Sequence, residues 1–386
     1  MRNLLRQLQA SFISPLAGPI IGKIVYNQIC TGGEPNSILI TASLAEGMDY
    51  SKYAGILVCT PICLTNPTYK LPPAAGIISP NHSLDDGDIV SIRPCGTINV
   101  LYRRKSLHND LFITQRCNSR CLMCSQPPIE NDDPYLLSES IKVIKLADKS
   151  TPVLGITGGE PTLLEAELLK LIELSTQHLP NTQLHLLTNG RLLQNESFAK
   201  KLAAVCRANL SVAFPLYSDI DSEHDYIIQT RGGFAQTVRG IHNLARYKIP
   251  IEIRVVIHKL NYQRLPQLAE FIYRNLTFVN HVALMALEPI GFAADNIELL
   301  WIDPFDYRAQ LGLATRFLAD RGINVSIYNH QLCIIPEELR SYSCKSISDW
   351  KVEFLECCKE CSSMSNCGGF FKSALPKHHS THIGPI

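Results

Sequence analysis

One short loop carries the residues most able to do chemistry. Three cysteines stand close together in Cys117-Asn-Ser-Arg-Cys121-Leu-Met-Cys124, directly after a strand-like run at 109–114. The gaps are too short for an ordered set of disulfides, but one curled loop can direct all three thiols at a single cluster. Thiolates are the usual ligands of iron-sulfur clusters, which normally take four. Three would leave one iron open to bind and cleave a substrate, much as catalytic zinc sites keep an open position.

A second motif, Gly158-Gly-Glu-Pro-Thr162, follows another strand-like run. Together with the cysteine spacing it resembles the radical S-adenosylmethionine (SAM) superfamily. The context Cys117 to Pro128 and the ending Cys367-Gly-Gly-Phe-Phe371 are similar to the His-Xaa-Ser system radical SAM maturases, HxsC. A zinc knuckle is the alternative for the loop. It would need a fourth ligand, for which His108 is the only close candidate, and zinc does not explain Gly-Gly-Glu.

Composition bounds the class of protein. A chain of 386 residues with 46% apolar content predicts two or three packed domains. A net charge of +1 gives no field for an anionic membrane and disfavours a nucleic-acid substrate. The 14 cysteines, without a secretory signal, indicate metal or redox work in a reducing, cytoplasmic setting. The apolar run near the N-terminus is broken by Ser14, Pro15 and Pro19, and no segment reaches membrane length.

Residues 1–107 are expected to form a β-rich N-terminal domain. Short β-branched runs separated by turns predict strands at 37–41, 55–59, 89–93 and 96–102. The last two are expected to pair as a hairpin, and Gly87 is expected to take a positive φ in the turn before them. The domain could be a structural cap, or an open sheet edge in it could accept an extended peptide.

Residues 108–322 alternate strand and helix patterns. Strands are predicted at 110–115, 153–157, 183–188, 210–217, 251–257 and 282–287. The intervening amphipathic stretches, such as 234–244, make six β/α repeats and therefore a parallel sheet with helices outside. The pattern leaves a closed barrel, a flat sheet and a partial barrel open. The superfamily resemblance implies an α/β fold with a partial (β/α)6 TIM-like barrel.

The candidate site residues all follow strands. In parallel α/β folds ligands lie at the carboxyl ends of the strands. The groups expected to meet there are the cysteine loop, Gly158-Gly159-Glu160, Thr188-Asn189-Gly190, Tyr217-Ser218-Asp219, His258 with Asn261, and Glu288-Pro289.

The resemblance implies a role for several of these residues. Gly158, Gly159 and Glu160 would hold the SAM amino group, and the backbone of Met123 would meet the adenine. Ser218 would contact the ribose and Arg254 the carboxylate. Plain alternatives remain, because Gly-Gly-Glu-Pro also makes a strand-to-helix turn and Arg254 could pair with Glu252 or Glu288.

The chemistry that the resemblance implies belongs to the cofactors. A reduced [4Fe-4S] cluster cleaves SAM to methionine and a 5′-deoxyadenosyl radical, which abstracts hydrogen from a peptide or small-protein substrate. An electron donor such as flavodoxin or ferredoxin, and a partner maturase, are implied as partners. No residue stands out as a general base or radical quencher.

A second group of cysteines lies in the expected C-terminal extension, 323–386, after a predicted helix at 304–320 and strand at 324–328. The spacing Cys358-x2-Cys361-x5-Cys367 is similar to SPASM and twitch extensions, which implies an auxiliary [4Fe-4S] cluster. Cys333 is the expected fourth ligand and Cys344 the alternative, while Cys357 could replace Cys358. Phe371 stands where a full SPASM pattern has a further cysteine, which favours one cluster. A four-cysteine zinc site fits the same spacing.

The sequence therefore predicts a radical SAM enzyme, and the resemblance implies maturation of a protein with His-Xaa-Ser repeats. Two rivals stay open. A radical SAM enzyme acting on a small molecule or RNA base would share the core motifs. A non-catalytic iron-sulfur or zinc scaffold would need four ligands at each site. The five cysteines outside the two groups are expected to be ordinary buried thiols, namely Cys30, Cys59, Cys63, Cys95 and Cys206.

Overall fold

The protein is represented by a computed structural model. It describes residues 7–12, 16–26, 35–45, 47–59, 69–205, 209–347, 351–375 and 377–386. Cys30, Cys63 and Cys206 lie outside the described residues. Contacts divide the chain into two units. The first comprises Met1–Thr114, Asp133–Ile156 and Lys170–Leu184, and the second Gln115–Asp132, Thr157–Leu169 and His185–Ile386. The domain boundaries expected from the sequence stay a prediction.

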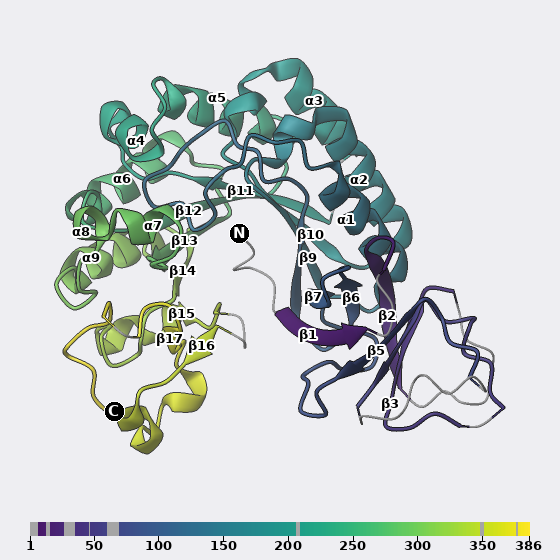
Figure 1. The fold of residues 1–386 in the computed structure, drawn as a ribbon. Helices are drawn as coiled ribbons and strands as arrows, with labels where there is room; N and C mark the ends of the chain where they lie inside the picture. The colour runs from purple at the N-terminus through teal and green to yellow at the C-terminus, as the bar shows by residue number, and fades with distance from the viewer. Residues whose placement is uncertain are drawn as a thin grey trace. The chain divides into compact units, whose positions relative to one another are not determined.

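The N-terminal strands of the first unit form a closed barrel (Figure 1). They are β1 Gln7–Phe12, β2 Ile20–Tyr26, β3 Ser37–Thr41, β4 Gly55–Val58, β5 Ala74–Ile78, β6 Ile89–Ile92 and β7 Thr97–Tyr102. Their order is β1-β5-β4-β3-β2-β6-β7, and β7 pairs back onto β1. Inward side chains such as Ile24, Ile38 and Leu57 fill the interior. Each described strand therefore has two partners.

The closure of the barrel bears on its expected role. β6 and β7 pair antiparallel as the predicted hairpin, and Gly87 has a φ of 87°. An open sheet edge is excluded for the described strands, because pairing occupies both sides of each. The role of a structural cap stays a prediction.

The second sheet has the order β15-β14-β13-β12-β11-β10-β9-β8 among the described residues. Its strands are β8 His108–Phe112, β9 Val153–Thr157, β10 Gln183–Leu187, β11 Leu210–Pro215, β12 Ile251–Ile257, β13 His281–Ala286, β14 Asn324–Tyr328 and β15 Ser343–Cys344. The pairs from β11 to β15 are parallel. The six predicted strands are confirmed with small shifts at their ends. The sheet is open, as a partial barrel requires, and β14 and β15 extend it.

Helices follow the strands as the patterns predicted. They are α1 Pro134–Leu146, α2 Glu165–His178, α3 Glu196–Val205, α4 Asp221–Ile228, α5 Gly233–Ala245, α6 Leu265–Asn275, α7 Phe292–Asp295, α8 Ile297–Leu300 and α9 Arg308–Ala319. In the second unit α4, α5, α6 and α9 lie on one face of β11–β14 (Figure 1). On β12, Ile251, Ile253, Val255 and Ile257 are fully buried, whereas the alternating residues from Glu252 to Val256 are half-buried. The half-buried side chains therefore point to the face without helices.

The chain after β14 has little regular structure. β16 Val352–Glu353 and β17 Phe370–Phe371 pair antiparallel. Between them, Cys357 and Cys358 lie in one short 3-10 turn, and Cys361 and Cys367 each directly follow such a turn. The predicted helix at 304–320 appears as the shorter α9, and the predicted strand at 324–328 is β14. In the part of the chain that the structure describes, every helix is too short or too polar to cross a membrane.

Candidate SAM and iron-sulfur site

The three-cysteine loop is held by backbone hydrogen bonds within the second unit. Arg120 N and Leu122 N donate to the last carbonyls of α4, at 3.2 and 2.9 Å, and Phe292 N donates to Cys124 O at 2.9 Å. A turn between Cys121 and Cys124 curls the loop. The thiol residues are half-buried. These contacts hold the loop between α4 and the start of α7, so the rest of the fold determines where its thiols lie.

The thiols share one weakly solvated environment. Burial raises the pKa of the Cys117 thiol to about 11, and the carboxylate of Glu160 adds to the rise. Burial also raises the pKa of Cys121 and of Cys124, and at Cys121 the negative charges of the other two thiolates add to it. Burial therefore disfavours the thiolate form of these side chains in the absence of a bound cation.

The Gly158-Gly159-Glu160 turn packs directly on this loop. A Cβ atom at Gly159 would lie 2.2 Å from the Arg116 carbonyl oxygen, so only glycine fits there. Glu160 N donates to the same carbonyl at 2.8 Å. The second glycine is therefore explained by contact with the cysteine loop, whichever ligand lies nearby.

Glu160 ties neighbouring strand ends together. Its side chain is fully buried and accepts hydrogen bonds from Thr162 N at 2.9 Å, Thr188 Oγ1 at 2.6 Å and Asn189 N at 2.6 Å. Burial raises the pKa of Glu160, and these hydrogen bonds oppose the rise. The carboxylate joins the ends of β9 and β10 beneath the cysteine loop.

Two residues after β10 contribute more than their sequence indicated. Asn189, expected at the site but also explained by a turn, donates from Nδ2 to Asn118 Oδ1 at 2.6 Å and to Cys117 Sγ at 3.9 Å. Arg191, which the sequence analysis missed, donates to the Asn118 carbonyl and to Ser119 Oγ. Burial lowers the pKa of Arg191, and the charges of Cys117 and Glu160 oppose this. Its position just after a predicted strand end is the sequence feature that could have indicated a role at the site.

The remaining predicted SAM contacts lie in the second unit. Met123 is buried beside Tyr217 in an apolar cluster that also contacts Cys121. Ser218 is buried, donates to Glu223 Oε2 at 2.7 Å and accepts from Ile220 N at 3.1 Å. Arg254 lies with its Nε 3.1 Å from Glu252 Oε1, the structural partner that the sequence left open. Met123 lies in the cysteine loop, Ser218 follows the end of β11, and Arg254 stands in the middle of β12. Their ligand roles stay predictions.

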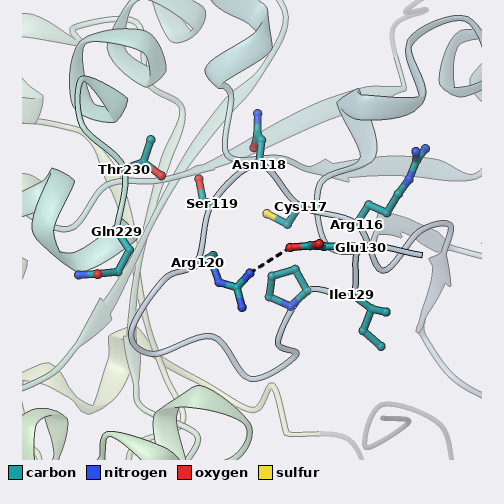
Figure 2. Close-up of a pocket in the computed structure, with 10 residues that line it drawn as sticks. Arg116, Cys117, Asn118, Ser119, Arg120, Ile129, Glu130, Gln229 and Thr230 are labelled. Atoms are coloured by element: carbon teal, nitrogen blue, oxygen red, sulfur yellow. Dashed lines mark hydrogen bonds and ion pairs between the residues drawn. The ribbon is translucent and has the colours of Figure 1, made fainter. Parts of the chain in front are cut away.

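A cavity of about 430 Å³ opens beside the cysteine loop. Figure 2 shows the Cys117 sulfur near the loop residues Asn118, Ser119 and Arg120 that line it. An ion pair of 3.5 Å joins Arg120 to Glu130 at its border. Cys121 and Cys124 do not line this cavity, since the loop directs Cys121 toward the apolar cluster around Tyr217.

The C-terminal cysteines gather around a second, mostly apolar cavity. Cys333, Cys358, Cys361 and Cys367 all line it, with Phe354, Phe370 and Ile383. Burial raises the pKa of the Cys333 thiol, and the charges of Cys367 and Cys361 contribute. Cys344 does not line this cavity, and Cys357 is exposed. The four thiols at this cavity are the four expected as auxiliary ligands.

Of the cysteines outside these groups, the structure describes Cys59 and Cys95. Cys95 is exposed and Cys59 half-buried, so the prediction of ordinary buried thiols is wrong for Cys95. Cys95 lies in the turn between β6 and β7, where its side chain meets Thr97 Oγ1 at 3.3 Å instead of the barrel interior.

The region that carries the first cysteine loop also carries the family match. Residues 111–272 match the Radical SAM superfamily. The chain contains a radical SAM superfamily domain. Its matched segment includes Cys117, Cys121 and Cys124, the Gly158 to Glu160 turn, and β12. The prediction of the superfamily is confirmed, whereas the finer resemblance to HxsC stays a prediction.

Curated relatives match this chain over part of their length. A probable GTP 3′,8-cyclase of Saccharolobus islandicus is 27% identical over 184 residues, 47% of this chain and 57% of the relative. The GTP 3′,8-cyclase of Petrotoga mobilis is 29% identical over 200 residues, 49% of this chain and 58% of the relative. The chain thus spans less than two thirds of these relatives. Among solved structures, Streptococcus suis SuiB bound to SAM gives a TM-score of 0.49 at 15% identity, covering 66% of this chain and 56% of SuiB.

The radical SAM domain implies a [4Fe-4S] cluster and SAM, and the donor set fits a cluster. Among the described residues, no three His, Cys, Asp or Glu side chains converge to hold a single metal ion. A [4Fe-4S] cluster binds each thiolate through a different iron, so its ligands need not converge on one point. The loop offers thiols only, in a buried setting whose raised pKa values call for a compensating cation.

Proposed function

We propose that this protein is a radical SAM enzyme that cleaves SAM reductively and abstracts hydrogen from a peptide or small-protein substrate. One observation carries the proposal: Cys117, Cys121 and Cys124 share a loop that Glu160, Asn189 and Arg191 hold at the carboxyl ends of parallel strands. Three cluster ligands leave one iron open for SAM. The bound cofactors supply the electron and the 5′-deoxyadenosyl radical.

The chain's own residues would bind and orient SAM. We assign the amino group to the Gly158 to Glu160 turn, the adenine to the backbone of Met123, the ribose to Ser218 and the carboxylate to Arg254. Glu160 and Ser218 already bond to the chain, so contacts there require a backbone group or a rearranged side chain. The apolar cluster of Met123, Tyr217 and Ile228 would help exclude water from the reacting atoms.

For the C-terminal thiols we propose one auxiliary [4Fe-4S] cluster on Cys333, Cys358, Cys361 and Cys367. Their shared apolar cavity supports this ligand set over Cys344 and Cys357. An apolar surround limits solvent access and so tunes the potential of a cluster. A structural zinc ion on the same thiols is the alternative. Metal analysis of purified protein separates the two.

The substrate class rests on resemblance to the His-Xaa-Ser maturases and on the auxiliary-type cysteines. A cytoplasmic setting, a flavodoxin or ferredoxin as electron donor, and a partner maturase belong to the same proposal. A second candidate is a purine nucleotide, because the curated relatives are named as GTP 3′,8-cyclases. The net charge of +1 favours neither.

One experiment separates these substrates. Anaerobically reconstituted, reduced protein is incubated with SAM and either a His-Xaa-Ser repeat peptide or GTP. The proposal predicts that the peptide stimulates 5′-deoxyadenosine formation and that the mass of the peptide itself changes. GTP should neither stimulate this formation nor be converted. Stimulation by GTP with conversion of the nucleotide, and no change in the peptide, would move the protein to the second candidate.

A further inference from the structure

A row of polar side chains crosses the face of the second sheet that carries no helices. His281 Nδ1 lies 2.8 Å from Glu252 Oε2, and His185 Nε2 lies 3.6 Å from Glu252 Oε1. The other ring nitrogens meet serine hydroxyls, His185 Nδ1 at 2.8 Å from Ser211 and His281 Nε2 at 2.9 Å from Ser326. The row spans five neighbouring strands, β10 to β14, with Glu252 at its centre.

The contacts assign hydrogen-bond roles along this row. A carboxylate only accepts, so His281 Nδ1 donates to Glu252, and each serine hydroxyl can donate to the histidine nitrogen that faces it. Burial alone would raise the pKa of Glu252, but contacts with His185 and His281 and the charge of Arg254 outweigh it and hold this pKa well below its usual range. Glu252 is therefore a fixed, ionised carboxylate, and its side chain is only 15% exposed.

Arg254 stands two residues further along the same strand and on the same face. Its Nε lies 3.1 Å from Glu252 Oε1, and its side chain is 28% exposed. Within the described residues the buried Nε completes no hydrogen bond, and neither terminal Nη group makes one. An arginine has five N–H donors in a planar fork, so this guanidinium keeps the paired donors that bind carboxylates.

Arg254 lies beside the strand end that leads toward the cysteine loop. Leu216 N donates to the Arg254 carbonyl at 3.1 Å. The next residue, Tyr217, packs in the apolar cluster that contacts Cys121.

We infer that Glu252 is a positioning residue: its ion pair with Arg254 orients the guanidinium so that the free Nη groups face the carboxylate of SAM, and His185 and His281 hold Glu252 in place. This inference rests on the proposed function and names a residue that acts through another. A fixed carboxylate behind the guanidinium restricts its rotation, which lowers the entropy lost when an anion binds.

The test compares Glu252→Gln, Arg254→Lys and the double variant in reconstituted protein. Arg254→Lys keeps the charge but loses the fork. The Kd and the KM for SAM are both expected to rise about tenfold in each single variant. A tenfold rise corresponds to the loss of one charge-assisted contact. The kcat at saturating SAM should change by less than about threefold, since the change affects binding. Glu338→Gln is the matched control, because it removes an exposed contact of 3.0 Å with Arg316.

The double variant gives the deciding comparison. Because Glu252 acts through Arg254, adding Glu252→Gln to Arg254→Lys should weaken SAM binding no further. In cluster-free protein, ¹⁵N spectra of the histidine rings should show His281 protonated at Nδ1 and a shift of that signal in Glu252→Gln. These results would support the inference.

Other outcomes overturn it. Wild-type affinity for SAM in a folded Glu252→Gln variant, or additive losses in the double variant, would show that Glu252 does not act through Arg254. A lower unfolding midpoint in Glu252→Gln, with unchanged SAM affinity in the molecules that remain folded, would also overturn it. The row of polar side chains would then serve only the stability of the fold. If the wild-type protein neither binds nor cleaves SAM, the proposed function itself fails.

Discussion

Gly159 and Glu160 show how single contacts hold the cysteine loop against the sheet. The glycine lets the Arg116 carbonyl approach, and the next residue hydrogen-bonds to that carbonyl and to the loop after β10. A motif expected from resemblance to bind SAM therefore also has a structural task. The two tasks are compatible, because both place the loop where a cofactor would meet it.

Gly159→Ala is expected to displace the loop. The added Cβ meets backbone at 2.2 Å, and backbone cannot rotate away as a side chain can. The free energy of unfolding should fall by about 1–3 kcal/mol, typical of overpacking, and iron uptake on reconstitution should fall with it. Urea denaturation and iron analysis measure both. Gly18→Ala is the control, because nothing lies within 4 Å of its added Cβ. Equal behaviour of the two variants would contradict this view of the motif.

Cys117→Ser should abolish 5′-deoxyadenosine formation, since it removes one of only three ligands to the SAM-binding cluster. Cys95→Ser should leave it unchanged, because Cys95 is exposed and belongs to neither thiol group. Liquid chromatography of the quenched reaction measures the nucleoside. Retained activity in Cys117→Ser would exclude this loop as the cluster site.

The strands were the most predictable elements. β-branched runs bounded by turns located β9 and β12 without error, because that signal lies within the segment itself. Closure of the N-terminal barrel and the addition of β15 depend on pairing between distant segments, which a local pattern does not contain. For the same reason Arg191 was missed, since its role comes from contact with Asn118 and Ser119 far away in the chain.

The C-terminal segment gives a prediction about one element. Cys361→Ala should leave SAM cleavage intact, lower the iron content from about eight to about four per chain, and block modification of the substrate. Cys357→Ala is the matched control, because Cys357 is a neighbouring but exposed cysteine outside the shared cavity. Iron analysis and mass spectrometry of the substrate are the measurements. Unchanged iron in Cys361→Ala would assign the tail to zinc or to a purely structural role.

Across the second unit, buried histidines should make the fold sensitive to acid. Burial lowers the pKa of His258 to about 3, and that of His224 and His330 to about 4. Below the ordinary histidine value of about 6.5 the unfolded chain therefore binds protons that the folded chain does not, and stability falls as the pH falls. The raised pKa of Glu160 opposes this with a single group.

The free energy of unfolding should decrease between about pH 6.5 and pH 4, with a slope of up to about 1.4 kcal/mol per pH unit for each histidine. Denaturant titration of the cluster-free protein at several pH values measures the slope. His224→Gln, which cannot take up the proton, should flatten it even if that variant is less stable throughout. A slope that is unchanged in this variant would contradict the assignment.

The most direct test of the whole account is anaerobic SAM cleavage by the intact protein. The chain is reconstituted with iron and sulfide, reduced with dithionite, and incubated with SAM, and 5′-deoxyadenosine is quantified beside iron. The account predicts the nucleoside together with about eight irons per chain, the content of two [4Fe-4S] clusters. No nucleoside from protein whose cluster is intact would contradict it.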